Sequence, residues 1–333
     1  RFTVILILMR NIAVLAVLVI IVLLFSAFNP IYCQEQSERN YGFSLGGMLG
    51  IVHGQAQEYV YPVTDTTHKY LSELLWDMKP VFYLGIQADF GRRNLMSAPG
   101  FFASVAFKAG IPGDTGVMED RDWQPQYGSG LTDYSRHTNI TREYIWLDAV
   151  AGASIPVKSI LYIKPFLGFS WAHFAFTGRD GYRNLYQGRT VVQSFEGREV
   201  INYEQDWLLV TAGFSIGTNI LLPFSINLSF QISPFAYCVS KDEHLATNTD
   251  NITYVHTTYI DVTYSELYIK PSINISYIWK NISFLGEFAW HFIEVSTGES
   301  YINTDDRGFD LNPNKAGAGL SLFDFSLIVK VLL

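Results

Sequence analysis

The stretch Ser225–Ser233, SINLSFQIS, alternates polar and apolar residues without a break. Successive side chains of a strand point to opposite faces, so this period of two predicts a β-strand with one apolar and one polar face. The same alternation returns in 266–277 and again in 323–333, where phenylalanine, leucine and valine alternate with Asp324, Ser326 and Lys330. The recurrence of this pattern favours an all-β fold.

Ten such segments follow one another, near 41–58, 70–91, 99–118, 139–155, 160–177, 201–221, 224–240, 256–278, 281–298 and 315–333. Short turns alternate with long polar connections, which are expected at 59–69, 119–138, 178–200, 241–255 and 299–314. An even number of long strands joined in this way is typical of an outer-membrane barrel. Many segments exceed the roughly 10 residues that cross a bilayer. We therefore predict a ten-stranded antiparallel transmembrane β-barrel that extends above the outer membrane. The alternative, a soluble β-sandwich, would have shorter strands of about 5–6 residues.

The beginning of the sequence differs from the rest. An almost unbroken apolar run, Ile12–Phe28, follows Arg10 and precedes Asn29 and Pro30. This arrangement predicts an export signal over residues 1–34 and a barrel over 35–333. A permanent membrane anchor is the alternative, because the run approaches the length needed to span a bilayer.

The composition narrows the function. The formal net charge of −8 argues against a nucleic-acid partner, whose phosphates need a basic surface. The two cysteines, Cys33 and Cys238, do not make a disulfide framework, and no zinc-binding spacing or nucleophile-elbow motif is present. Six tryptophans are expected in interfacial girdles or in the barrel wall, namely Trp76, Trp146, Trp171, Trp207, Trp279 and Trp290.

Two acidic clusters stand out in the predicted outer connections. The stretch Met118–His137, MEDRDWQPQYGSGLTDYSRH, contains Asp120 and Asp122, and a second cluster contains Asp242 and His244. Residues two apart share one side of a strand, and the topology would bring the clusters together from opposite walls. One of two close carboxylates has a raised pKa, and a carboxylate beside an imidazole orients it. A water could be activated between the pairs. Solvated acids at the base of a loop are the alternative.

These motifs resemble those of the omptin family, outer-membrane aspartate/histidine proteases. The resemblance lies in MEDRDW at 118–123, LTDYSRH at 131–137, DEH at 242–244 and KAGAGL at 315–320, and it extends over most of residues 41–333. It implies a surface endopeptidase of aspartyl type, independent of metal and cofactor, which acts on peptides or proteins outside the cell. It also implies a monomer in outer-membrane lipid with its active site facing the extracellular side.

The resemblance implies catalytic roles for four residues. Asp120 and Asp122 match the paired aspartates of the family, and Asp242 and His244 match its Asp-His dyad. In the family a water is activated between the residues at the positions of Asp120 and His244. Ser135 matches a serine that supports the site.

Three further residues are implied in substrate binding, with less agreement. Glu58 matches an acid that receives a basic side chain before the cut through a charge-assisted bond. The second acid of that pocket stands two residues before Asp242 in the family, but this chain has Ser240 there, which favours a broader pocket. Asp133 would contact a basic residue beyond the cut, or be a solvated loop acid.

The lipopolysaccharide contacts of the family should fall on the outer wall near 164–171, where Lys164 is the one charged residue. Either the lipid requirement is lost, or the host envelope lacks that lipid. Two other functions remain open from the sequence. One is a catalytically inactive barrel that serves as an adhesin or envelope structural protein. The other is a metal-dependent hydrolase, because three aspartates and a histidine can bind a divalent cation.

Overall fold

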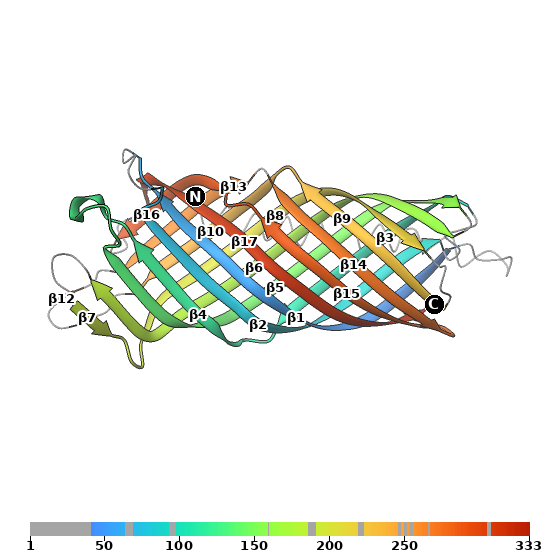
Figure 1. Cartoon of the computed structure of the whole chain (residues 1–333), viewed down its shortest axis with the longest axis horizontal. Coiled ribbons are helices and arrows are strands. Elements are labelled where there is room, and N and C mark those ends of the chain that lie inside the picture. Colours follow the sequence, from blue (N-terminus) through green and yellow to red (C-terminus); the bar gives the residue numbers. More distant parts are fainter. Residues whose placement is uncertain are drawn as a thin grey trace.

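The chain forms a closed β-barrel in the computed structural model, which describes residues 41–63, 69–92, 98–158, 160–185, 191–218, 223–245, 248–249, 252–253, 256–265, 267–304 and 308–333 (Figure 1). The wall consists of β1 (Tyr41–Tyr61), β2 (Ser72–Arg92), β3 (Gly100–Gly110) with β4 (Gly113–Asp122), β5 (Asp133–Lys158), β6 (Leu161–Leu185), β8 (Glu199–Thr218), β9 (Phe224–Ser233) with β10 (Ala236–His244), β13 (Thr257–Ser265) with β14 (Tyr268–Trp279), β15 (Ile282–Ile293) with β16 (Thr297–Thr304), and β17 (Asp310–Leu332). With each interrupted strand counted once, the predicted ten-stranded antiparallel barrel is confirmed.

The ring closes between the first and the last strand. β1 pairs with β17 from Ser44 opposite Leu332 to Tyr61 opposite Lys315. β17 in turn pairs with β15 and β16. Closure leaves the barrel without an exposed edge, as a wall in lipid requires.

Small elements stand at the end of the barrel that carries the long connections: β7 (Val191–Ser194), β11 (Asn248–Thr249), β12 (Ile252–Thr253) and the 3-10 helix Pro125–Tyr127. Within the described part of the chain, no helix is long and apolar enough to cross a membrane. The predicted export signal lies outside the described residues.

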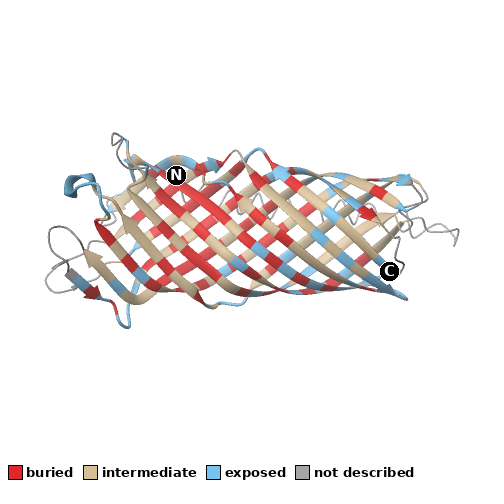
Figure 2. Ribbon diagram, viewed as in Figure 1, coloured by how far each residue is buried: buried red, intermediate tan, exposed pale blue. Residues whose placement is uncertain are grey.

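The half of the barrel away from the long connections carries its apolar side chains on the outside. On β17, Phe325 and Leu327 are 49% and 62% exposed, whereas Asp324 and Ser326 are buried in the interior. Figure 2 shows the same alternation of exposed and buried residues along neighbouring strands in this half. An apolar exterior around a polar interior is the arrangement of a barrel wall in lipid.

The strands continue beyond this apolar zone and take up much of the predicted loops. The segment 119–138, which the sequence indicated as a connection, is mostly strand, because β4 runs to Asp122 and β5 begins at Asp133. β6 likewise runs to Leu185, and β10 ends only at His244. In water both faces of a strand can be polar, so the alternation that marks the lipid zone fades while the hydrogen-bonded ladder continues.

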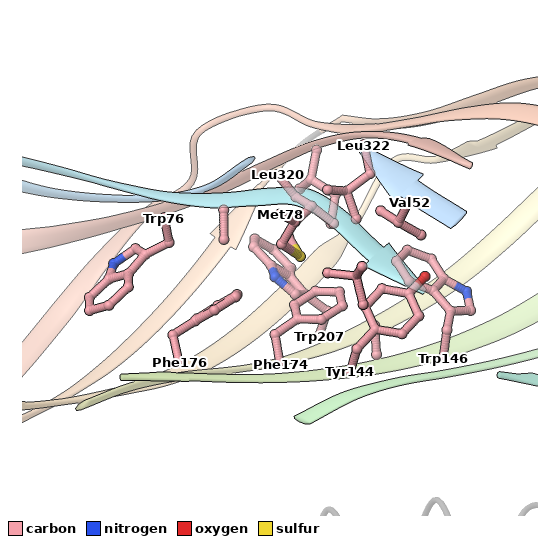
Figure 3. Close-up of a cluster of buried hydrophobic side chains, with 14 of the residues drawn as sticks. Val52, Trp76, Met78, Tyr144, Trp146, Phe174, Phe176, Trp207, Leu320 and Leu322 are labelled. Atoms are coloured by element: carbon pink, nitrogen blue, oxygen red, sulfur yellow. The ribbon is translucent and has the colours of Figure 1, made fainter. Parts of the chain in front are cut away.

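A hydrophobic cluster fills the middle of the lumen (Figure 3). Trp76, Trp146 and Trp207 are fully buried in it, so their predicted place in girdles or wall is wrong. Trp76 stacks on Phe176 and on Tyr203, with ring centroids 5.6 Å and 5.3 Å apart. We call this whole hydrophobic cluster the aromatic plug. It separates an upper cavity of about 380 Å³ from a lower cavity of about 260 Å³.

The lower cavity is lined by charged side chains on the lumen side of the lipid zone. Lys330 pairs with Asp89 at 2.8 Å, and Lys270 pairs with Asp148 at 3.1 Å. Lys164 also lines this cavity, so the one charged residue of 164–171 faces the lumen and not the outer wall. It lies in the polar phase of β6, which faces the lumen.

Candidate active site

The upper cavity lies at the end of the barrel that carries the long connections. Strands from the whole circumference contribute to its wall, from β1 and β2 through β4, β5 and β10 to β17. It contains six of the eight residues that the sequence singled out: Glu58, Asp120, Asp122, Ser135, Asp242 and His244. The two acidic clusters, more than a hundred residues apart in the chain, therefore share one cavity.

Asp242 and His244 stand two residues apart on β10, so both side chains point into the cavity. The imidazole Nε2 and the Asp242 Oδ2 are 2.7 Å apart. The edge of the Tyr259 ring packs against the imidazole at 5.7 Å between centroids. Asp242 is 3% exposed, and its other oxygen, Oδ1, has no hydrogen-bond partner among the described residues. The dyad is thus held in place from one side and open to the cavity on the other.

The charges around His244 favour its protonated form. Desolvation alone would lower the pKa of the imidazole, but the charge and hydrogen bond of Asp242 outweigh it. Asp120 and Asp122 add to this effect, and together these acids raise the pKa of His244 to about 9. The influence of both β4 aspartates on the imidazole indicates that the two clusters interact electrostatically across the cavity.

Asp120 and Asp122 come from the last residues of β4. The hydroxyl of Ser72 on β2 donates to Asp120 Oδ1 at 3.3 Å. Burial, followed by the charge of Asp122, raises the pKa of Asp120, while His244 opposes the shift. Burial, followed by the charge of Asp133, raises the pKa of Asp122 to about 6. These paired carboxylates hold protons more tightly than isolated ones do, as expected for like charges in one site.

An arginine within the predicted connection 178–200 belongs to this site. Arg183, on β6, lines the cavity and donates from Nε and Nη2 to Asp133 Oδ2. Its charge lowers the pKa of both Asp120 and Asp122. Asp133 itself is only 2% exposed, so it is not a solvated loop acid, and it does not line the cavity.

Two residues of β5 complete this side of the cavity. Ser135 is buried directly opposite Asp120 on β4 and Arg183 on β6. His137 is buried as well, and its Nδ1 donates to the carbonyl oxygen of Asp180 at 2.6 Å. Burial lowers the pKa of His137, so its imidazole stays neutral, in contrast to that of His244.

The predicted pocket for a basic side chain is formed differently from the expectation. Glu58 of β1 faces the cavity and is 2% exposed. Ser240 does not line the cavity; it is buried with its hydroxyl bonded to Tyr203. Asp261 of β13, which the sequence reasoning missed, lines the cavity near Glu58. A carboxylate at an inward position of an otherwise alternating strand was the signal that could have identified it.

If the site hydrolyses peptide bonds, as the resemblance implies, the pH dependence of cleavage should report the coupling across the cavity. If His244 accepts a proton from water, it must first be neutral, so kcat/KM should rise as the pH increases toward about 9. Asp122→Asn removes a negative charge that stabilises the imidazolium, and the rising limb should therefore move to lower pH. A pH profile of kcat/KM for both proteins measures this shift. An unchanged limb would show that His244 does not set it.

The donor groups of the cavity are arranged in pairs. Among the described residues, no group of three or more His, Cys, Asp or Glu side chains could hold a metal ion. The site can chemically hold a water between a carboxylate and an imidazole, and it can bind a cation against buried carboxylates.

Comparison with known proteins agrees with this architecture. The sequence model of the Omptin family matches residues 39–330. The crystal structure of outer membrane protease OmpT from Escherichia coli is similar, with a TM-score of 0.72 and 18% identity over 90% of this chain and 99% of that one. The translocator domain of autotransporter NalP from Neisseria meningitidis has a TM-score of 0.31 and 7% identity, with 92% of each chain covered. No curated protein matches the sequence.

Proposed function

This chain belongs to the omptin family, and from that premise we propose that it is an outer-membrane endopeptidase whose upper cavity faces the outside of the cell. OmpT, a protein that shares its fold, is named an outer membrane protease. The observation that carries the proposal is the hydrogen-bonded pair of Asp242 and His244 in the same cavity as Asp120 and Asp122.

The reaction uses water as the nucleophile. The His244 Nε2 faces Asp242 Oδ2, which leaves Nδ1 to take a proton from a water held by Asp120. The resulting hydroxide attacks the carbonyl carbon of the peptide bond and forms a tetrahedral intermediate. The imidazolium then returns the proton to the leaving nitrogen, so that the C–N bond breaks and an acid and an amine are released.

The surrounding charges suit this sequence of steps. Asp242 fixes the tautomer and orientation of the imidazole and stabilises its cationic form, the role of the carboxylate in hydrolase triads. Asp122 and Arg183 adjust the charge around Asp120 with opposite signs. Glu58, buried in the cavity wall, receives a basic side chain of the substrate before the cut through a charge-assisted bond.

Cleavage of short arginine- and lysine-containing peptides by the refolded protein tests the proposal. We expect cleavage inside the peptide, at an unchanged rate in EDTA, because protein side chains alone activate the water. Mass spectrometry of the products identifies the bond that is cut. Activity that EDTA abolishes and a divalent cation restores would contradict the metal-independent mechanism. A barrel that cleaves no member of a broad peptide library would instead favour an adhesin or structural role.

A further inference from the structure

Three carboxylates lie along one arc of the upper cavity. Glu58 comes from β1, Asp261 from β13 and Asp242 from β10, and all three line the cavity. Between the strands of Glu58 and Asp261, the cavity wall includes two small residues, Ala316 on β17 and Ser300 on β16, beside Asn312, Asn314 and Lys315 of β17. Small side chains here leave room for a long side chain that enters from the cavity.

Two of these carboxylates are buried without enough partners. Glu58 and Asp261 are 2% and 4% exposed. Glu58 Oε2 and Asp261 Oδ1 have no hydrogen-bond partner among the described residues, although Trp76 hydrogen-bonds the Glu58 side chain and Ser300 the Asp261 side chain. A buried polar atom without a hydrogen-bond partner destabilises the folded protein, and more so if the atom is charged. Two such oxygens facing one cavity indicate a place for a guest that brings hydrogen-bond donors.

The electrostatics of Glu58 and Asp261 favour the binding of a cation between them. Burial, followed by the charges of Asp242, Asp261 and Asp120, raises the pKa of Glu58. Burial also raises the pKa of Asp261 to about 7, against the hydrogen bond from Ser300. Lys315, the lysine in the cavity wall, is exposed on β17. A guanidinium or ammonium group between the two acids would relieve both their repulsion and their missing hydrogen bonds.

The position of Asp261 explains the serine at 240. Asp261 stands directly opposite Ser240 in the antiparallel pair β10–β13. Directly opposite residues point to the same face with Cβ atoms about 4.5–5.5 Å apart. A carboxylate moved from position 240 to position 261 therefore stays at the same level of the barrel, one strand closer to Glu58 along the wall.

We propose that Asp261 is a specificity-determining residue that, together with Glu58, binds the basic side chain preceding the cleaved bond, in place of the acid missing at Ser240. The inference rests on the proposed function. It replaces the broad pocket suggested by Ser240 with one that is selective for arginine or lysine, because its two carboxylates come from different strands and face the same guest.

The test compares two peptides that differ only before the cut, one with arginine and one with norleucine. In the full-length refolded protein, Asp261→Asn should lower kcat/KM for the arginine peptide by about 100-fold, the loss expected for a buried charge pair. The norleucine peptide should change by no more than about threefold. The control Glu299→Gln removes an exposed acid of neighbouring β16 outside the cavity and should alter neither value.

An exchange variant separates charge from folding. The double variant Asp261→Ser, Ser240→Asp places the carboxylate on the neighbouring strand β10 instead of β13, and the arginine preference should return. Equal losses for both peptides in Asp261→Asn, or an arginine preference that survives it, would overturn the inference.

A binding measurement distinguishes this inference from the proposed function. His244→Ala removes the proposed base, so fluorescence anisotropy of labelled peptides can be followed without cleavage. We expect the arginine peptide to bind more tightly than the norleucine peptide, and Asp261→Asn to abolish the difference. If this binding preference is found but the wild-type protein cleaves neither peptide, the proposed protease function is refuted and the cation pocket is retained. Equal binding of both peptides would refute the pocket.

Discussion

Replacing His244 by alanine is expected to lower kcat for an arginine-containing peptide by about 10³-fold, within the range that a general base contributes. Asp120→Ala should have a similar effect, because both residues hold the same water in the proposed mechanism. The double variant should be little worse than either single variant, since residues that act as a unit show non-additive losses. Steady-state kinetics on the three purified proteins measure all of these effects.

Glu119 provides a matched control for this experiment. It neighbours Asp120 on β4 but points to the other face, where it binds Arg121 and Tyr134. Glu119→Gln should keep kcat within about twofold, because this side chain points away from the cavity. Multiplicative losses in the double variant would mean that Asp120 and His244 act in separate steps, and the shared water would have to be abandoned.

The second large effect is expected at Glu58. Glu58→Gln keeps the size of the side chain and removes its charge, so kcat/KM for an arginine peptide should fall by about 100-fold. Peptides with an uncharged residue at that position should be cut about as well as before, because the catalytic groups are unchanged. The ratio of the two kcat/KM values is the quantity to measure.

The outcome at Glu58 also separates binding from support of the fold. If the variant loses activity on both kinds of peptide to the same extent, Glu58 holds the cavity together rather than selecting the substrate. Gln57 is its neighbour in β1, and Gln57→Glu offers a control that moves the charge to the opposite face of the strand. It should not restore the arginine preference when combined with Glu58→Gln.

The fold could be predicted from the sequence because lipid imposes a simple rule. Apolar residues at every second position, as in Phe323 to Val331, indicate a strand whose apolar face contacts lipid while the polar residues between them face the lumen. Above the lipid zone the rule no longer applies, so the ends of β4 and β10 were placed too early. The prediction for Trp76, Trp146 and Trp207 was wrong for a related reason, since an aromatic ring packs equally well at a membrane interface and in an apolar lumen. Which of the two holds for Trp76 depends on the phase of its strand.

The candidate site could likewise be predicted only in part. Asp120, Asp122, Asp242 and His244 could be identified because each pair lies within one strand, where spacing alone sets the common face. The roles of Arg183 and Asp261 could not be predicted, because these roles come from neighbours across strands: Asp133 beside the first and Ser240 opposite the second. Such neighbours depend on the register of the barrel, and spacing within one strand does not fix register.

The aromatic plug forms the floor of the upper cavity and separates it from the lower one. A polypeptide cannot thread through it, so both arms of a bound segment must leave over the rim where they entered. Under the proposed function, suitable substrates are flexible tails and exposed loops long enough to reach the level of His244 and return, whereas a compact protein without such a segment is not cleaved. Both new chain ends would then have to leave on the same side of the plug.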